Sequence, residues 1–302
     1  MNKKKPSFFI VGAPKCGTTA LAKYISEHDD IFMSSPKEPH YFATNFDNRM
    51  RIAQSESHYL SLFNNAKKGQ ICGEASVWYL YSAEAIKNIA EFDPSAKIIV
   101  MVRNPTDMIY SLHSQKIHSL DEDILDFDEA WRLSWERERG KFIPKKCREP
   151  KTLLYHKIAN FYDQIIYLYK FFPKNQVKII NFHDFKESNL NVYKDVLDFL
   201  NIEYDGKKEF KKINERKEHK SLFIANLINY KRPKSVKNLT NKIKESLGIV
   251  KIPIWSHFFY LMKKLNTKVV KANPMSQKIK EEINSHYKES YSKLLKELKN
   301  NG

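Results

Sequence analysis

The fold of this chain is decided by the stretch FFIVGAPKCGTT, residues 8–19. Its first four residues form a short apolar run bounded by a proline and a glycine, a pattern that predicts a buried strand. Residues 18–28 carry apolar side chains four positions apart and predict a helix, whose start either Thr18 or Thr19 can cap. The chain therefore opens as a strand, a tight turn and a helix, which is how an α/β domain begins.

Two more apolar runs predict buried strands, at residues 97–102 (KIIVMV) and 176–181 (QVKIIN). A helical pattern follows each of them, over residues 106–118 and then up to residue 200. Strands that alternate with helices require crossover connections, so they are expected to run parallel. The predicted fold class is α/β, with a parallel central sheet flanked by helices.

The rest of the chain is expected to belong to the same single domain, residues 1–302. Residues 119–150 are rich in charge and tryptophan and predict a helical insertion with a basic loop. Residues 152–171 predict one long amphipathic helix. Prolines divide the last part of the chain into helices, so we expect a core over residues 7–221 and a helical C-terminal extension over residues 222–302.

Composition excludes several classes of protein. Hydrophobic residues make up 42% of the 302 residues, enough for a sizeable core. No apolar run reaches the roughly 18 residues of a transmembrane helix. Three scattered cysteines suit neither a disulfide framework nor a CxxC zinc site, and they fit a reducing compartment. Because the first apolar run is too short for a signal peptide, a cytoplasmic location is expected.

The formal net charge is +17, from 52 Lys and Arg against 35 Asp and Glu. Such a chain attracts anions, including phosphate-bearing nucleotides and acidic polymers. Lysine is nevertheless spread along the whole chain, so a compositional bias explains the charge equally well. We therefore expect no nucleic-acid partner, and the oligomeric state stays open.

The turn between the first strand and the first helix is suited to an anion, because a helix N-terminus presents unpaired N–H groups and a positive dipole end. Gly12 and Gly17 are five positions apart, as in the GxxxxGK[ST] loop that binds nucleotide phosphates. Lys15, however, comes two residues before the second glycine instead of directly after it. Lys15 would neutralise an anion without a metal, with Thr18 and Thr19 as further donors.

The same stretch resembles the 5′-phosphosulfate loop of sulfotransferases that use 3′-phosphoadenosine 5′-phosphosulfate (PAPS). In that family a second segment holds the 3′-phosphate through an Arg at a strand end and a Ser on the next helix. Residues 102–111 (VRNPTDMIYS) are similar, with Arg103 and Ser111 in those places. The resemblance implies a P-loop-NTPase-like sulfotransferase fold, PAPS as donor, PAP as product and no metal. The residues that it assigns to the nucleotide are Lys15, Cys16, Gly17, Thr18, Thr19, Arg103, Ser111 and Lys220.

Residues 36–42 (PKEPHYF) are similar to a K-E-x-H/Q-[FY]-F segment of heparan-sulfate-type members of the family. In those enzymes the Glu takes a proton from the acceptor, so the resemblance assigns the catalytic base to Glu38 and a catalytic role to the adjacent Lys37. A carboxylate within hydrogen-bond reach of the acceptor suits this role. His40 is the rival base, since other members of the family use a histidine, and His113 is a weaker candidate.

Residues 73–79 (GEASVWY) are similar to the family's G-E-x-[ST]-P-x-Y segment, which lines the cleft, although Val77 replaces the proline. Glu74 either orients Lys15 or an acceptor hydroxyl, or is structural. Three aromatic residues here either stack on a sugar or adenine or belong to the core, namely Trp78, Tyr79 and Tyr81.

Residues 214–221 lie where bacterial members have a basic loop that closes over the cofactor. Lys220 replaces an Arg there, and Lys217 is a second candidate; a lysine offers a point charge, so a bidentate contact is lost. A further basic group, which either meets an acidic glycan or is solvated, contains Lys145, Lys146 and Arg148.

Together these segments predict an enzyme that moves a sulfuryl group from PAPS to a hydroxyl or amine, by in-line transfer with a carboxylate base. A carbohydrate is the favoured acceptor. Two alternatives stay open: a P-loop nucleotide kinase or NTPase, and a non-catalytic anion- or glycan-binding module on the same fold.

Overall fold

The computed structural model describes residues 4–211, 213, 217–219, 261–262, 265–269 and 275–300. The chain divides into two compact units. The larger consists of Met1–Ile117, Asp121–Asn214 and Pro274–Gly302, and the smaller of His118–Leu120 and Glu215–Asn273. In the smaller unit two short strands, β6 (Lys217–His219) and β7 (Thr267–Val269), pair antiparallel.

The larger unit is built on a five-stranded sheet with the order β2-β3-β1-β4-β5, in which every neighbouring pair is parallel. The strands are β1 (Phe8–Gly12), β2 (Ile31–Met33), β3 (Ile71–Ala75), β4 (Lys97–Val102) and β5 (Val177–Asn181). The predicted parallel α/β fold is therefore confirmed, and the apolar runs correctly locate β1, β4 and β5. They do not predict β2 and β3, because β2 has only three residues and β3 contains Gly73 and Glu74.

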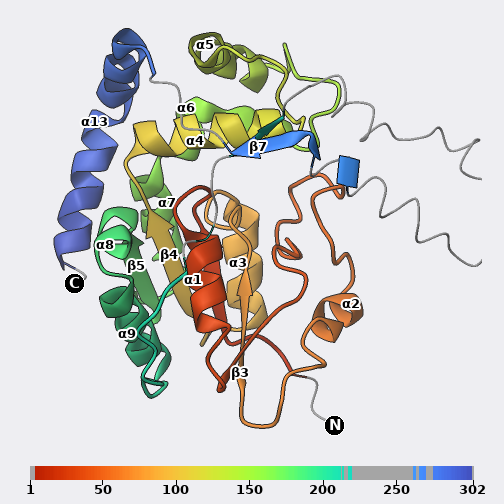
Figure 1. Cartoon of the computed structure of the whole chain (residues 1–302), viewed down its shortest axis with the longest axis vertical. Helices are drawn as coiled ribbons and strands as arrows, with labels where there is room; N and C mark the ends of the chain where they lie inside the picture. The colour runs from red at the N-terminus through yellow and green to blue at the C-terminus, as the bar shows by residue number, and fades with distance from the viewer. Residues whose placement is uncertain are drawn as a thin grey trace, which may run out of the picture. The chain divides into compact units, whose positions relative to one another are not determined.

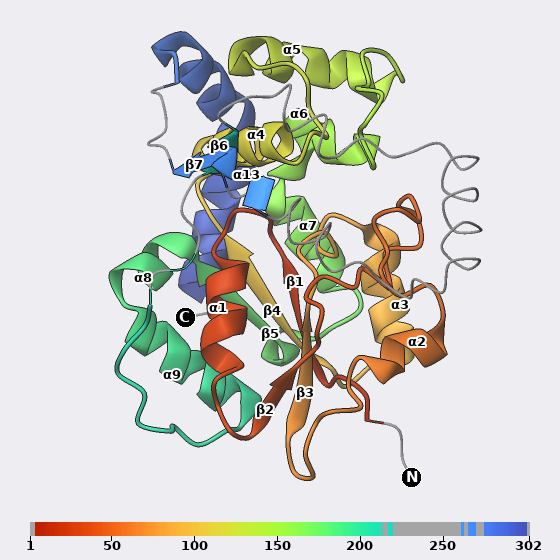
Figure 2. The same cartoon turned by 45° about the vertical axis from the view of Figure 1, so that its right-hand side comes forward.

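Helices cover both faces of this sheet (Figures 1 and 2). On one face α1 (Thr18–Ile25) contacts α9 (Asn189–Leu200). On the other α3 (Ala83–Phe92) contacts α7 (Phe161–Leu168), and the C-terminal helix α13 (Gln277–Asn300) packs against α7 and β5. Other helices of the described residues are α2 (Glu56–Ser61), α4 (Pro105–His118), α5 (Phe127–Glu138), α6 (Tyr155–Ile158) and α8 (Phe182–Glu187), with 3₁₀ turns at Pro150–Leu153 and Lys174–Gln176.

The single long helix predicted over residues 152–171 is wrong. The structure divides this segment at Leu154 (φ −83°, ψ 67°) and Asn160 (φ −78°, ψ 62°), leaving a 3₁₀ turn, α6 and α7. At the second break the Gln164 side-chain amide donates to the Ile158 carbonyl oxygen (3.0 Å). Such local side-chain bonds compete with the helical ladder, and the apolar periodicity does not reveal them.

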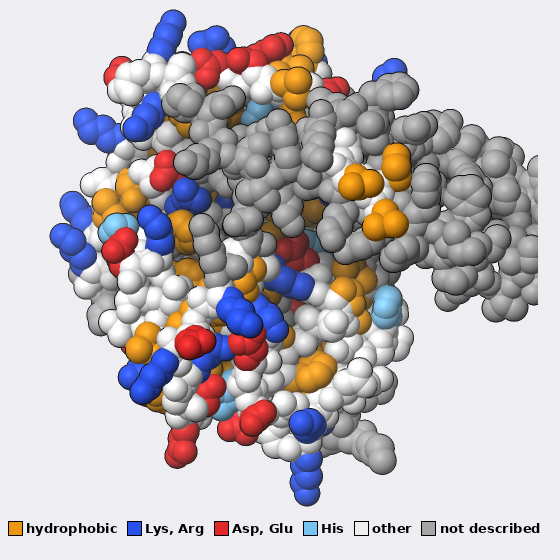
Figure 3. All heavy atoms as spheres, viewed as in Figure 1, with side chains coloured by type: hydrophobic (Ala, Val, Ile, Leu, Met, Phe, Trp, Pro, Cys, Tyr) orange, Lys and Arg blue, Asp and Glu red, His pale blue; other side chains and the backbone are white. Residues whose placement is uncertain are grey.

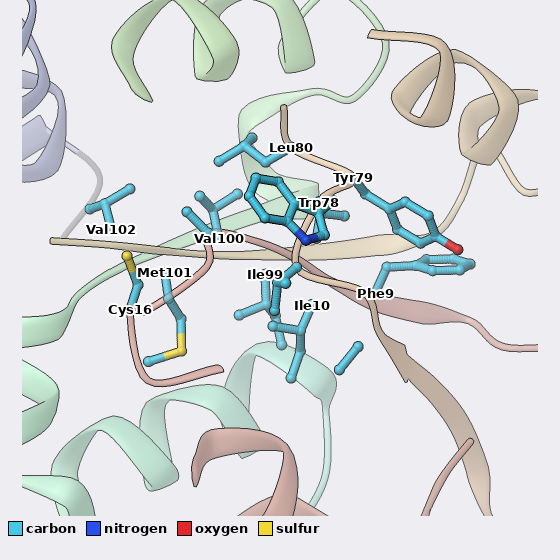
Figure 4. Packing of buried hydrophobic residues seen from close by; sticks show 14 of the residues in the cluster. Phe9, Ile10, Cys16, Trp78, Tyr79, Leu80, Ile99, Val100, Met101 and Val102 are labelled. Atoms are coloured by element: carbon cyan, nitrogen blue, oxygen red, sulfur yellow. The ribbon is translucent and has the colours of Figure 1, made fainter. Parts of the chain in front are cut away.

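The core of the larger unit is centred on β1 and β4, whose middle residues are fully buried. Figure 4 shows part of this cluster, with side chains from both strands and from the turn after β3. Cys16 belongs to the same cluster. The turn after β1 is therefore packed onto the sheet, and the core determines its position.

Lys and Arg side chains occur in several places on the face seen in Figure 3, mixed with Asp and Glu. Within the part of the chain that the structure describes, none of the helices is both long enough and apolar enough to cross a membrane.

Candidate active site

The predicted site residues come from the carboxyl ends of neighbouring strands. β1 lies at the centre of the sheet, with β3 on one side and β4 on the other, so the direction of strand addition reverses there. Ligands of open α/β sheets bind at such a switch point, outside the carboxyl ends of the strands. The phosphate loop (residues 12–19), the turn after β3 and the β4–α4 turn all lie at this edge.

The phosphate loop is shaped by its two glycines. A Cβ on Gly12 would lie 2.9 Å from Leu80 Cβ and 3.0 Å from the Val77 carbonyl oxygen, so only glycine fits against the turn after β3. Gly17 has a left-handed backbone (φ 91°) and is the N-cap of α1, without a side-chain capping bond. The expected threonine cap is therefore wrong, because Thr18 is already the first residue of the helix. The first N–H groups of α1 keep the character of an anion site.

Lys15 and Cys16 occupy the middle of the phosphate loop. Lys15 has a left-handed backbone (φ 62°), a conformation that is uncommon for a residue with a side chain and recurs at functional sites. The Cys16 side chain is buried, with its Sγ 3.4 Å from the Pro14 carbonyl oxygen. Burial raises the pKa of the Cys16 thiol to about 12. The thiol therefore stays protonated, and Cys16 is not a nucleophile.

Arg103 lies beside the phosphate loop, although 88 positions separate it from Lys15 in the sequence. Its Nη1 donates to the Lys15 carbonyl oxygen (3.4 Å), and its Nη2 is 3.8 Å from the Asp107 carboxylate. The guanidinium also lies over the Phe182 ring, 4.8 Å from its centroid. Ser111 is half-buried in the second turn of α4. The two sequence motifs therefore meet at one edge of the sheet.

The 36–42 loop brings a cation, a carboxylate and a histidine next to the phosphate loop. Lys37 Nζ donates to Glu38 Oε1 (2.6 Å) and to the Thr19 hydroxyl (3.2 Å). His40 Nε2 lies 3.5 Å from Glu38 Oε2. Burial by itself raises the pKa of Glu38, but the contact with His40 and the Lys37 ammonium outweigh burial and lower that pKa to about 2. Glu38 is therefore ionised and able to accept a proton.

Glu38 is more accessible than His40. The Glu38 side chain is 37% exposed and the His40 side chain 4% exposed. His40 Nδ1 is buried without a hydrogen-bond partner, and the His40 backbone N–H donates to the Ser76 hydroxyl (3.1 Å). Both residues have left-handed backbones, with φ of 62° and 49°. Of the two candidate bases, the Glu38 carboxylate is therefore the one that a molecule from solvent can reach more easily.

Glu74 is completely buried at the end of β3 and faces hydroxyl groups. Its carboxylate accepts from Tyr59 (2.5 Å) and Ser76 (2.5 Å), and the Tyr79 hydroxyl is a third partner. Burial raises the pKa of Glu74 to about 7 against the opposing effect of these hydroxyls. Because its side chain does not reach the solvent, Glu74 is not placed to orient an acceptor hydroxyl directly.

The other residues predicted to line the cleft differ in how deeply they are buried. Trp78 and Tyr79 are buried and belong to the core, whereas Tyr81 is half-buried and lies edge-on to Trp78. His113 is buried, with its Nε2 2.8 Å from the Ile124 carbonyl oxygen. Of the three aromatic candidates, Tyr81 is therefore the one with enough exposed surface to stack on a ligand.

Two basic groups complete the predicted set. Lys220 lies outside the described residues, and Lys217 belongs to β6 in the smaller unit. Arg148 donates twice to the Asp121 carboxylate, at 3.0 and 2.7 Å, and so makes a structural ion pair. The two lysines before Cys147 are exposed, which is what a solvated loop predicts.

Sequence reasoning missed two residues that support the site, Phe182 and Tyr59. Phe182 packs against the phosphate loop as well as Arg103, since a Cβ on Gly17 would lie 3.0 Å from its ring. Its place directly after a predicted strand is the signal that could have found it. Tyr59 lies in α2, and no local pattern marks its contact with Glu74, 15 positions away.

Comparison with known proteins gives consistent matches. The chain matches the family model described as "Sulfotransferase domain" over residues 5–294. It is similar to the bifunctional heparan sulfate N-deacetylase/N-sulfotransferase 3 of Mus musculus, with 27% identity, covering 65% of this chain and 22% of the mouse protein. It is also similar to the heparan sulfate glucosamine 3-O-sulfotransferase 6 of Homo sapiens, with 31% identity, covering 38% of this chain and 32% of the human protein.

Among solved structures, a sulfotransferase from Alicyclobacillus acidocaldarius is similar to this chain. The TM-score is 0.62 and the identity 29%, covering 74% of this chain and 90% of that chain. The shared region is only about a fifth of the mouse relative and a third of the human one. These matches agree with the parallel sheet and do not favour a kinase, an NTPase or a non-catalytic module.

Proposed function

This chain belongs to the sulfotransferase domain family, and from that premise we propose that it transfers a sulfuryl group from PAPS to a hydroxyl or amine of a carbohydrate. The sulfur–oxygen bond to the 5′-phosphate breaks, a bond from sulfur to the acceptor atom forms, and the acceptor loses a proton. The mouse and human relatives are both named for heparan sulfate, one as an N- and the other as a 3-O-sulfotransferase. Their names support a carbohydrate acceptor and are compatible with transfer to either a nitrogen or an oxygen atom of it.

The donor is proposed to lie along the phosphate loop, with its 3′-phosphate at Arg103 and Ser111. An arginine fork and a helix start without a side-chain cap both suit phosphate oxygens. Lys15, Thr18 and Thr19 would face the 5′-phosphosulfate, where Lys15 stabilises the charge that the leaving phosphate acquires. The described residues contain no cluster of three or more His, Cys, Asp or Glu side chains arranged for a metal, and the proposal uses none.

Glu38 is proposed as the base that takes the acceptor proton. Lys37 holds this carboxylate and also contacts Thr19 in the phosphate loop. A bound phosphosulfate would therefore compete with Glu38 for the Lys37 ammonium. Weakening that ion pair would raise the pKa of Glu38 from about 2 toward its ordinary value, so donor binding would strengthen the base.

The observation that carries the proposal is the contact of Arg103 Nη1 with the Lys15 carbonyl oxygen at 3.4 Å. The groups assigned to the two ends of the donor are neighbours, and Lys37 links the base to the same loop. Arg103 and Lys15 on separate surfaces would have been incompatible with one bridging nucleotide.

The experiment is to incubate the protein with PAPS carrying radioactive sulfur and a panel of glycans, lipids and phenols. Labelled glycan is the expected product. Mg²⁺-dependent turnover of ATP would instead support a kinase or NTPase, and nucleotide binding by calorimetry without transfer to any acceptor would support a binding module.

A cytoplasmic location is also proposed, supported by the three cysteines, which are all free and buried, as in a reducing compartment. Recovery of the native protein outside the cytoplasmic fraction would contradict it.

A further inference from the structure

The loop that contains Glu38 is attached to the end of β3 by three backbone N–H groups. The Glu38 N–H donates to the Ala75 carbonyl oxygen (3.2 Å), and the His40 N–H donates to the Ser76 hydroxyl (3.1 Å). The third, the N–H of residue 42, donates to the Tyr79 hydroxyl (3.3 Å). Two of the three anchors are thus side-chain hydroxyls, whose orientation is not determined by the backbone.

Both hydroxyls are oriented by one buried carboxylate. Ser76 Oγ donates to Glu74 Oε1 (2.5 Å), and the Tyr79 hydroxyl lies within reach of both Glu74 and Ser76. A hydroxyl has one proton to donate and two lone pairs to accept with. When its proton points to Glu74, its oxygen is left to accept from the loop N–H. Tyr59 completes the group by donating to Glu74 Oε2 (2.5 Å).

This attachment has a conformational task. Glu38 and His40 both hold left-handed backbones, which cost on the order of 1 kcal/mol or more for a residue with a side chain. Such a conformation persists only where surrounding contacts over-determine it. The three N–H bonds supply such contacts at Glu38 itself, at His40 and at residue 42.

We propose that Glu74 is a positioning residue for the sulfuryl transfer: through the Ser76 and Tyr79 hydroxyls it holds the 36–42 loop so that Glu38 faces the phosphate loop. The inference rests on the proposed role of Glu38 as base. Glu74 touches neither donor nor acceptor, because it is completely buried. Burial also raises its pKa to about 7, a cost that a purely apolar core position would avoid.

The test replaces the carboxylate and one hydroxyl separately. Glu74→Gln keeps the shape of the side chain but replaces one carboxylate oxygen by an NH₂ group, which donates hydrogen bonds. The hydroxyl that faces this NH₂ group must therefore turn its proton away from residue 74. Ser76→Ala removes the hydroxyl that joins Glu74 to the His40 N–H. At about pH 8, where Glu74 is mostly ionised, we expect each variant to lower kcat about tenfold or more. The affinity for PAP should change less than about twofold, because the phosphate loop is untouched.

Glu122→Gln is the matched control. Glu122 is also a buried carboxylate that accepts a tyrosine hydroxyl, from Tyr155 (3.0 Å), but it is paired with Arg137 on α5 and accepts from two nearby backbone N–H groups. This variant should lower Tm and leave kcat per folded molecule unchanged. A role of Glu74 in stability alone would make Glu74→Gln behave like Glu122→Gln.

If Glu74→Gln and Ser76→Ala both fold and both have the kcat of the wild type, the inference is overturned. If Glu74→Gln does not fold, the kcat of Ser76→Ala alone decides. Glu38→Gln separates this failure from that of the proposed function. If Glu38→Gln is inactive while both other variants turn over normally, the positioning role alone is wrong. If Glu38→Gln itself turns over normally, the base assignment fails and the inference with it. In a Glu38→Gln background, Glu74→Gln should cause no further loss.

Discussion

The proposed donor side, at the phosphate loop, and the proposed acceptor side, in the 36–42 loop, differ in the ion pairs that they contain. On the donor side, Arg103 faces the Lys15 backbone, and its neighbouring carboxylate, Asp107, is 61% exposed and 3.8 Å away. On the acceptor side, Lys37 is 2.6 Å from the Glu38 carboxylate. The ion pair of Arg103 is thus longer and more exposed than that of Lys37, whose partner in the 36–42 loop is kept ionised.

The acceptor side also contains two carboxylates with opposite environments. Glu38 lies beside the Lys37 ammonium and the His40 ring, with a pKa of about 2, and Glu74 lies among hydroxyls, with a pKa of about 7. Hydroxyls offset desolvation less than an ammonium does, so the same side chain is charged in one place and titratable in the other. The contrast separates a group that can accept a proton during the reaction from one that organises the loop.

Of the variants that test the difference between Glu38 and Glu74, Glu38→Gln is expected to have the largest effect on turnover. Removing the base should lower kcat about 100-fold or more without weakening the binding of PAPS, since Lys37 is then released to the donor. Steady-state kinetics and calorimetry measure the two quantities. Glu27→Gln is the control. The pKa of Glu27 is also lowered by a lysine, Lys207, with which it forms an ion pair, but Glu27 lies just after the C-terminal end of α1. Near-normal turnover of Glu38→Gln would eliminate it as the base.

A second prediction concerns the pH dependence of stability. The folded pKa of Glu74 is raised above its ordinary value of 4.5, so its contribution to stability is full below about pH 4.5 and is lost as the pH rises through about 7. The loss is on the order of 3 kcal/mol. Denaturant titrations from about pH 5 to 8 should show the free energy of unfolding falling more steeply for the wild type than for Glu74→Gln. Parallel curves would be inconsistent with a titrating Glu74.

On the donor side, Arg103→Ala should weaken PAP binding by about 10- to 100-fold, the contribution of a charge-assisted hydrogen bond. Affinity for an analogue without the 3′-phosphate should hardly change. Calorimetry with both nucleotides measures the difference, and Arg139→Ala, on an arginine paired with Glu136 at the surface, is the control. Equal losses for the two nucleotides would reject the assignment of Arg103 to the 3′-phosphate.

The smallest expected effect concerns the contact between the Arg103 guanidinium and the Phe182 ring. Phe182→Leu removes the ring face beneath the guanidinium and should weaken PAP binding about threefold, as a partly exposed cation–π contact predicts. Phe185→Leu is matched, because Phe185 also packs near Gly17, at 3.2 Å from its would-be Cβ. PAP titrations that give equal losses for both variants would assign the effect to packing of the phosphate loop.

The sequence by itself determined the features that depend on neighbours along the chain. The apolar runs of β1, β4 and β5 and the glycine turn after β1 are local patterns, because a buried strand and a tight turn each impose their own residue types. The segment with Lys15 was identified from this turn, whereas the segments with Glu38 and Arg103 were identified by their resemblance to motifs of the sulfotransferase family. The periodicity at residues 152–171 was misleading, since it does not reveal the breaks at Leu154 and Asn160, near the second of which the Gln164 side chain bonds to the Ile158 carbonyl oxygen.

Only the tertiary structure decided which of these segments meet. Parallel pairing brings the ends of β1, β3 and β4 to one edge, and this places Arg103 beside Lys15 across 88 positions. The Tyr59 hydroxyl of α2 meets Glu74, and Phe182 reaches Arg103, through further tertiary contacts. Such contacts depend on strand order and crossover geometry, which local residue patterns do not encode, so the support beneath Glu38 could not be read from the chain alone.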